Sequence, residues 1–583
     1  MPKGVERRNF MSNCYSVLLD TVSIQKYIFQ SNKLKENLGA SFLVESIFQQ
    51  KNTKIEDSEK NDPLFDLKTV ITDIFFPQQF THLDHWKTNP EKLFISEKPV
   101  EIAYIGGGNA LLFFQDEDKA IEFIKTWTRN LLIYAPGIQT AVALNKFDFN
   151  QKVFRSERKK LARILDKNQQ NFTPQTIIPQ HGITAECTRS GYSMDVWNEK
   201  TADAAYVSSV TNAKILGAKK SNDAIHLDYQ QLLNFSPVKG KTTSFRFPDQ
   251  LDDLGCIKSE DNIIAIVHID GNGMGDQFNQ IESLEAFRKL SIDVDKATKS
   301  AFRKLLSQII NRYDEIMDEL GFDLSGKNAQ RSVPTDKEGR RLLPIRPIIL
   351  GGDDITFVCA GKLGIYFSEL FLEYFAQEKV RDNIVDLTAC AGVVMTKTAY
   401  PFYRGYNLAE ELCSNAKRIR VTEGNQEGSY IDFHVSSGGF SGSLKDIREH
   451  NYTVAQGNLV FRPYQLGSDK TNPRSYQQLL ENVREMSKMP NSKIHQLREV
   501  LTQSEGTTIQ YLKQLKYRKE SLPQFTLLEG EETFFYFNPP KDKQHKKDDH
   551  SSKKEFMFTP YYDMIELMAN YPVNFLPKQG DEK

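Results

Sequence analysis

The feature that most constrains the fold is a pattern that occurs twice in the chain. An apolar run ends in an acidic residue at 15–20 and again at 262–270. In each half a second element follows, at 103–114 and 348–358, in which two apolar runs flank a glycine-rich turn. Short apolar runs indicate buried strands, and a glycine turn between two of them indicates a β-hairpin. We therefore expect each half to contain a sheet with an acid at the end of one strand.

The spacing of these elements predicts a tandem repeat. The chain between the acid and the hairpin is of similar length in the two halves (20–109 and 270–354), and a third apolar run follows each hairpin, at 137–144 and 387–394. Three landmarks in the same order are the expected signature of a duplicated unit. We predict two α/β (α+β) domains at 10–165 and 255–440, with a connecting subdomain at 166–254 and a C-terminal helical domain at 441–583. The last domain shows helical periodicity at 475–484, 494–501 and 508–515.

Composition limits the function classes. The 75 basic and 76 acidic side chains among 583 residues nearly cancel, whereas a protein that grips a long duplex usually has a clear positive excess. Small anions such as nucleoside triphosphates need only a local patch, although a nucleic-acid groove on one face is not excluded. None of the six cysteines forms a CxxC pair, which argues against a disulfide framework and a zinc ribbon. No apolar run reaches the roughly 18 residues that span a bilayer, so we expect a cytoplasmic protein with no membrane partner.

The candidate chemistry lies at the acids of the second half. Asp353 and Asp354 follow Gly351 and Gly352 in the hairpin turn, and Asp270 ends the neighbouring apolar run. Taken alone, Asp-Asp after Gly-Gly is also an ordinary surface turn. The apolar flanks favour a buried hairpin instead, and three acids at the ends of buried strands are costly unless a cation neutralises them. Two-metal phosphoryl transfer needs such a set of carboxylates.

Four stretches together resemble a known family: 20–45, Asp270-Gly-Asn-Gly-Met-Gly275, Gly351-Gly-Asp-Asp354 and Ala409–Lys417. The two halves are similar to the paired palm domains of the CRISPR polymerase, the large subunit of type III CRISPR effector complexes. Stand-alone relatives and, more distantly, GGDEF nucleotide cyclases share this fold. The resemblance covers most of 10–440 and implies two ferredoxin-like palm domains in tandem.

The resemblance implies a nucleotidyltransferase that makes cyclic or linear oligonucleotide messengers from ATP or another triphosphate in antiviral defence. A ribose 3′-hydroxyl would attack the α-phosphate with loss of pyrophosphate, at a site holding two Mg²⁺ (or Mn²⁺) ions. By position, the metal ligands would be Asp270, Asp353, Asp354 and the carbonyl of Gly271. The residues expected to contact nucleotides are Gly271, Asn272, Gly273, Gly351, Gly352, Lys417, Asp20, Gly107 and Asn109. Lys417 is equally well interpreted as a solvated helix lysine.

The chain departs from the family pattern in its first palm. Gly108 and Asn109 stand where the second palm has Asp353 and Asp354. We therefore expect one working palm and one degenerate palm, which binds an acceptor nucleotide. No His-Asp dipeptide occurs, so the HD nuclease of many members is not expected. Expected partners are nucleoside triphosphates, CRISPR-type subunits with guide and target RNA, and a downstream effector that the product activates. A catalytically silent scaffold or RNA-sensing subunit remains the alternative, and a template-dependent polymerase is a third one.

Overall fold

The computed structural model describes most of the chain. The described residues are 14–49, 51, 65–75, 83–95, 97–148, 154–170, 184–199, 205–234, 243–257, 262–325, 327–380, 385–423, 426–436, 442–467, 472–518, 520–525, 536–537 and 557–576. Within these ranges, no helix is both long and apolar enough to cross a lipid bilayer. All six cysteines are free thiols, and all but Cys256 are buried.

The first half contains a four-stranded antiparallel sheet with the strand order β2-β3-β1-β4. Two helical segments and a hairpin lie between its first and last strands, which is the ferredoxin-like β-α-β-β-α-β arrangement. The strands are β1 (Cys14–Val22), β2 (Val100–Gly106), β3 (Asn109–Phe114) and β4 (Gln139–Phe147). The helices are α1 (Ile24–Phe29), α2 (Leu34–Ser46), α3 (Leu67–Ile74), α4 (His85–Thr88), α5 (Glu117–Tyr134) and α6 (Phe154–Gln170).

The second half repeats this order and extends it, because its six-stranded sheet runs β10-β11-β8-β14-β15-β18. The strands are β8 (Ile263–Gly271), β10 (Ile345–Gly351), β11 (Asp354–Ala360), β14 (Ala389–Lys397), β15 (Tyr430–Val435) and β18 (Tyr464–Gln465). The helices are α9 (Met274–Gln280), α10 (Leu284–Asn311), α11 (Tyr313–Glu319), α12 (Gly364–Ala376) and α13 (Phe402–Thr422). The predicted tandem α/β fold is therefore confirmed.

The two hairpins match in detail. Gly106 pairs with Asn109, and Gly351 pairs with Asp354, so both turns have the same length. The strand before each turn carries an irregularity at the same distance from it, after Ile102 and after Pro347. The same backbone geometry therefore presents different side chains in the two domains.

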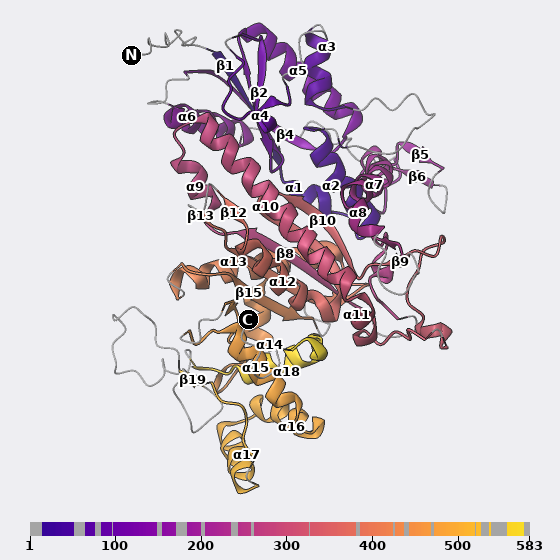
Figure 1. The fold of residues 1–583 in the computed structure, drawn as a ribbon, viewed down its shortest axis with the longest axis vertical. Helices are drawn as coiled ribbons and strands as arrows, with labels where there is room; N and C mark the ends of the chain where they lie inside the picture. Colours follow the sequence, from indigo (N-terminus) through magenta and orange to yellow (C-terminus); the bar gives the residue numbers. More distant parts are fainter. Residues whose placement is uncertain are drawn as a thin grey trace, which may run out of the picture.

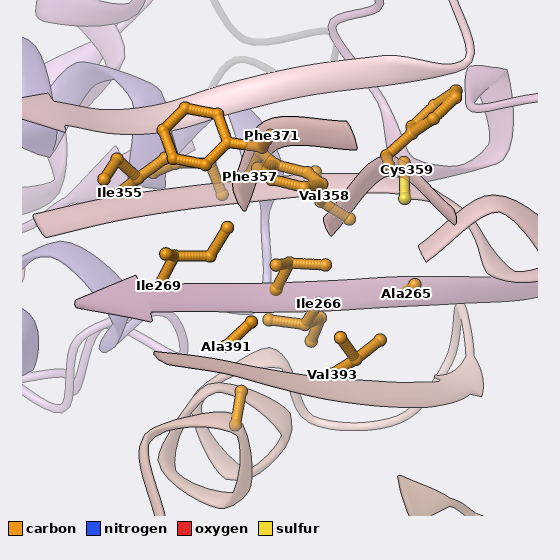
Figure 2. Packing of buried hydrophobic residues seen from close by; sticks show 14 of the residues in the cluster. Ala265, Ile266, Ile269, Ile355, Phe357, Val358, Cys359, Phe371, Ala391 and Val393 are labelled. Atoms are coloured by element: carbon orange, nitrogen blue, oxygen red, sulfur yellow. The ribbon is translucent and has the colours of Figure 1, made fainter. Parts of the chain in front are cut away.

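The core of the second domain decides which side chains face the site. Successive residues of a strand point to opposite faces of a sheet, so Ala265, Val267 and Ile269 share one face of β8. Figure 2 shows apolar residues of β8, β11 and β14 packed together with Phe371 of α12. The other face of β8 carries Asp270 at its end. This face packs against α13 at Gly392, where a β-carbon would lie 2.0 Å from a helix carbonyl.

The two domains contact each other reciprocally. Helix α10 of the second domain packs on β2 of the first, and α2 of the first packs on β10 of the second, as Figure 1 shows for α10. Arg288 on α10 is completely buried; its side chain donates to the carbonyl of Ala103 (2.6 Å) and forms an ion pair with Glu101 (2.7 Å). A buried ion pair is strongly destabilised when one partner is lost. This pair therefore helps to hold the domains together.

The remaining elements extend both domains. The predicted connecting subdomain, 166–254, contains a hairpin and two helices, and its long helix packs against α2. These elements are β5 (Val196–Asn198), β6 (Ala205–Val207), α7 (Ser209–Asp228) and α8 (Gln230–Leu233). Short strands pair as β7 (Phe245–Arg246) with β9 (Arg341–Leu342) and as β12 (Lys379–Val380) with β13 (Val385–Asp386). Single-turn 3₁₀ helices are Leu251–Asp253, Ala329–Arg331, Gly361–Leu363 and Val573–Phe575.

The C-terminal region is mainly helical, and its three predicted helices are present. The helices are α14 (Leu444–Asn451), α15 (Tyr476–Ser487), α16 (Asn491–Leu501), α17 (Glu505–Tyr517) and α18 (Tyr561–Asn570). A small sheet accompanies them, formed by β16 (Thr453–Val454), β17 (Gly457–Asn458), β20 (Met557–Phe558) and β19 (Tyr536–Phe537). Buried Glu369 of α12 accepts hydrogen bonds from Tyr476 and Tyr571, which ties this region to the second domain.

Candidate active site

Two of the predicted acids meet at one end of the second sheet. Asp270 near the end of β8 is the register partner of Asp354 at the start of β11, so both carboxylates lie on the same face. Asp353 occupies the turn between β10 and β11, next to Gly352, whose φ is +61°. This left-handed conformation favours glycine. The structure therefore places Asp270 and Asp354 side by side, with Asp353 in the adjoining turn.

Gly271 follows Asp270 and packs tightly on the turn. Its backbone N–H donates to the carbonyl of Asp353 at 3.1 Å. A β-carbon at this position would lie 2.7 Å from the β-carbon of Asp353, which is too close for any larger residue. The next residue, Asn272, is buried, and its side-chain amide donates to Thr388 Oγ1 at 3.0 Å. Asn272 thus anchors the loop, and Gly273, with φ +67°, is the N-cap residue of α9.

Lys417 reaches this site from α13. Its ammonium donates to Asp270 Oδ2 at 2.6 Å and to the carbonyl of Gly271 at 2.8 Å. These oxygens belong to two of the residues expected to hold a metal. The structure therefore places Lys417 in the site, where its positive charge partly compensates the acids.

The site nevertheless keeps an excess of negative charge. Burial, followed by the charges of Asp270, Asp353 and Glu410, raises the pKa of Asp354 to about 8. Burial and then Asp270 also raise the pKa of Asp353. Asp354 Oδ1 is buried without a hydrogen-bond partner among the described residues. An oxygen-rich, negatively charged cluster of this kind attracts a hard cation.

His268 does not neutralise Asp354, although its Nδ1 lies 3.5 Å from Asp354 Oδ1. Burial lowers the pKa of His268 to about 4, so the ring is uncharged near neutral pH. In the described part of the chain, no three His, Cys, Asp or Glu side chains come together as a metal-binding group. Magnesium commonly takes only one or two protein carboxylates and completes its shell with water and substrate phosphates. The acid pair with the Gly271 carbonyl fits such a site.

Three further residues at this site were not identified from the sequence. Tyr406 and Glu410 lie on the same face of α13 as Lys417, at helical spacing, and His268 precedes Asp270 by two residues on β8. Burial, followed by the charge of Asp270, raises the pKa of Glu410. The helical period from Lys417 could have pointed to Glu410, whereas the approach of His268 to Asp354 depends on strand pairing.

The first domain presents a matching but weaker constellation. Asp20 pairs with Asn109 as Asp270 pairs with Asp354. Gln169 Nε2 donates to Asp20 Oδ2 at 2.8 Å, in the way that Lys417 binds Asp270. Gly107 lies in the turn with φ +59°. Asp20 therefore lies beside Asn109 and Gln169, so this site contains one carboxylate and two side-chain amides.

A groove of about 1290 Å³ lies between α13 and the C-terminal region and reaches Glu410. Several of its basic side chains are already paired: Arg448 Nη2 donates to both carboxylate oxygens of buried Asp432, and Arg474 pairs with Glu423. A duplex or long single strand requires a basic track. The lining of this groove mixes five basic side chains (Arg418, Lys445, Arg448, Arg462 and Arg474) with four acidic ones (Glu410, Glu411, Glu423 and Glu449).

Comparison with known proteins agrees with this geometry. Residues 263–423, which carry all three acids and Lys417, match the family model for the second palm domain of Cas10/Cmr2. Residues 263–423 are therefore similar to a Cas10/Cmr2 palm domain. This matched segment contains every strand of the palm core, from β8 to β14. The predicted relationship to the CRISPR polymerase family is confirmed for this domain.

No curated protein sequence matches the chain. Solved structures that match the chain include a Csm1-Csm4 cassette in complex with cA3 (TM-score 0.43, 13% identity, 89% of this chain and 69% of that chain covered). The apo Csm1-Csm4 cassette gives a TM-score of 0.42 at 13% identity, with 90% and 69% covered. The cassette with one ATP gives a TM-score of 0.41 at 13% identity, with 88% and 68% covered.

Proposed function

We propose that this protein is a nucleotidyltransferase that joins ATP or another nucleoside triphosphate into cyclic or linear oligonucleotides. The observation that carries the proposal is the cluster of Asp270, Asp353 and Asp354 on a Cas10/Cmr2-type palm, with its excess negative charge and Lys417 beside it. We further propose that it acts as the large subunit of a type III CRISPR effector complex, with guide and target RNA as its other partners.

Mg²⁺ or Mn²⁺ would be held by Asp270, Asp354, Asp353 and the carbonyl of Gly271. Bound there, the ions would neutralise the acids and the triphosphate and activate the ribose hydroxyl for attack. The fit is supported by the buried oxygen of Asp354 that has no hydrogen-bond partner in the described structure. It is also supported by the position of Lys417, whose ammonium already contacts Asp270 and Gly271.

The residues of the chain would then act on the substrate as follows. Lys417 leaves Asp270 and binds the triphosphate, because an ammonium is attracted to phosphate oxygens as well as to a carboxylate. Gly351 and Gly352 allow the nucleotide to approach the turn, since a side chain at either position would project into open space near the acids. The 3′-hydroxyl forms a bond to the α-phosphorus, the bond to pyrophosphate breaks, and the hydroxyl proton passes to solvent.

We propose that the first domain binds the acceptor nucleotide. Asp20 and Asn109 are paired in the same register as the catalytic acids, yet the turn carries no further carboxylate. One carboxylate with the amides of Gln169 and Asn109 can hydrogen-bond a ribose or a base. The presence of Gly108 and Asn109, where the second domain has Asp353 and Asp354, also favours the second candidate function, a scaffold subunit without catalytic activity. Activity assays distinguish the synthase from the scaffold.

The test is incubation of the purified protein with Mg²⁺ or Mn²⁺ and each nucleoside triphosphate, with and without target RNA, followed by mass spectrometry. The double variant Asp353→Ala/Asp354→Ala serves as the inactive enzyme, and Asn109→Ala as a matched change in the first domain. We expect oligonucleotide products that disappear in the double variant, while Asn109→Ala weakens acceptor use and retains triphosphate binding. Absence of products and of Mg²⁺-dependent ATP binding in the wild type would refute the synthase and favour the scaffold.

A further inference from the structure

A polar cluster outside the active site joins two segments of the connecting region. Its members are Cys187 and Ser190 on one segment and Ser208 and Thr211 at the start of α7. Each pair is separated by two residues, so the sequence reads Cys-x-x-Ser and Ser-x-x-Thr. This is the spacing with which two pairs of cysteines hold a structural zinc ion. Here only one of the four positions is cysteine.

The side chains of the two pairs meet in space. Cys187 Sγ lies 3.6 Å from Thr211 Oγ1, Ser190 Oγ lies 2.8 Å from Ser208 Oγ, and Ser208 Oγ donates to Thr211 Oγ1 at 3.1 Å. Four sulfur ligands about 2.3 Å from a zinc ion stand about 3.8 Å from each other. The three separations given above, 3.6, 3.1 and 2.8 Å, are all shorter than this, as expected when direct hydrogen bonds replace bonds to a central ion.

The backbone around Cys187 forms a tight turn. The carbonyl of Cys187 accepts from the N–H groups of Ser190 (3.2 Å) and Gly191 (2.8 Å), and the N–H of Cys187 donates to the carbonyl of Tyr192 at 2.7 Å. Gly191 has φ +74°, a conformation that favours glycine. The first pair is therefore held on a rigid loop that points its two side chains at the start of α7.

The thiol also lies in surroundings that favour its ionised form. Burial alone would raise its pKa, but the backbone N–H groups of Ser208 and Arg189 and the hydroxyls of Ser190 and Thr211 lower the pKa of Cys187 to about 7. Cys187, Ser208 and Thr211 are each only 1% exposed. Donors directed at a buried sulfur are also typical of thiolate sites, in which the metal ligand is the ionised sulfur.

We propose that Cys187, Ser190, Ser208 and Thr211 form a metal-free cross-link with the geometry of a four-ligand zinc site, in which hydroxyl hydrogen bonds replace the ion. The cross-link fixes the 187–192 turn to α7, which itself packs on α2 of the first palm. It also positions the β5–β6 hairpin, whose Trp197 and Tyr206 are about half exposed and pack edge to face.

The test introduces cysteine at the three hydroxyl positions in the triple variant Ser190→Cys/Ser208→Cys/Thr211→Cys and titrates it with Co²⁺. We expect one equivalent of cobalt to bind with the visible absorption bands of a tetrahedral thiolate complex, and Zn²⁺ to displace it and raise the Tm. The wild type serves as one control. The same triple variant with Cys187→Ser is the other, and it should bind cobalt much more weakly because one thiolate is missing.

Two outcomes would overturn the proposal. A folded triple variant without tetrahedral cobalt bands would show that the four positions do not converge as inferred. A wild-type Tm that falls when EDTA is added in the presence of excess Mg²⁺, which keeps the Asp270–Asp354 site supplied, would show that the Cys187 cluster already depends on a zinc-like metal. If the triple variant folds only with Zn²⁺, the proposal is supported, because metal binding and folding are coupled. If it folds in neither condition, Ser208→Cys/Thr211→Cys supplies three thiolates, and its cobalt spectrum decides.

Discussion

Replacing Asp354 by asparagine should stabilise the metal-free protein at alkaline pH. The pKa of Asp354 is raised from 3.8 to about 8, so the folded protein retains a proton that the unfolded chain releases at lower pH. The free energy of unfolding therefore falls as pH rises from about 4 to about 8, and the full penalty remains above that range. Asparagine resembles the protonated carboxyl in shape and does not titrate.

The magnitude follows from the burial of the group. At about 1.4 kcal/mol for each pKa unit, the full displacement corresponds to roughly 6 kcal/mol. About a third of the Asp354 side chain (32%) is exposed, so solvent screens part of this penalty. We expect the advantage of Asp354→Asn over the wild type to grow by about 2 kcal/mol between pH 5 and pH 9.

The assay is urea-induced unfolding with EDTA at both pH values. Asn109→Asp is the matched control, because it places a carboxyl opposite Asp20 in the equivalent register; it should lower stability at pH 9 more than at pH 5. Added Mg²⁺ should stabilise the wild type and leave Asp354→Asn nearly unchanged. Parallel pH dependences of the wild type and Asp354→Asn would refute the argument that Asp354 is a costly buried acid.

Three further changes test other parts of the structure. Gly271→Ala should lower stability by about 1–3 kcal/mol through overpacking against the hairpin turn, measured by urea unfolding, while Gly351→Ala, with open space at its β-carbon, should change it by under about 0.5 kcal/mol. Ser23→Gly should raise the free energy of unfolding by about 0.5–1 kcal/mol, because Ser23 has φ +55° at the start of α1 and relief of this strain exceeds the entropic cost of glycine; an unchanged or lower midpoint would contradict this. Arg288→Ala should cost about 3–5 kcal/mol by leaving Glu101 buried without its partner, and a double variant with Glu101→Gln should recover part of that loss in the same assay.

Much of the fold was accessible from the sequence because burial leaves local patterns. An apolar strand that ends in Asp270, and a hairpin that turns at Gly351-Gly352, have a single arrangement that buries their apolar faces, and this arrangement also brings Asp270 beside Asp354. The same logic located Asp20 and Asn109. Each of these predictions depended on a local pattern, an apolar run with its terminal acid or a glycine turn between two apolar runs.

The missed features depend on contacts between distant segments. Glu410 approaches the acids only because Gly392 allows α13 to lie directly on the sheet. Gln169 is near Asp20 only because α6 returns along β4. The connecting region was predicted as a separate subdomain, a boundary that stays a prediction, and the packing of α7 on α2 has no local signature. The cluster of Cys187 with Ser190, Ser208 and Thr211 could not be predicted either, because serine and threonine at this spacing are not a recognisable motif until the fold brings them together.

The reciprocal contact between the two palms has a consequence for how the protein could diversify. A pair of identical subunits must carry every substitution twice, so both halves keep or lose chemistry together. A duplicated unit within one chain is free of that restriction. Here Gly108 and Asn109 removed negative charge from one turn while the hairpin kept its shape. Such an arrangement lets the two halves differ, because only the second hairpin keeps two adjacent carboxylates at its turn.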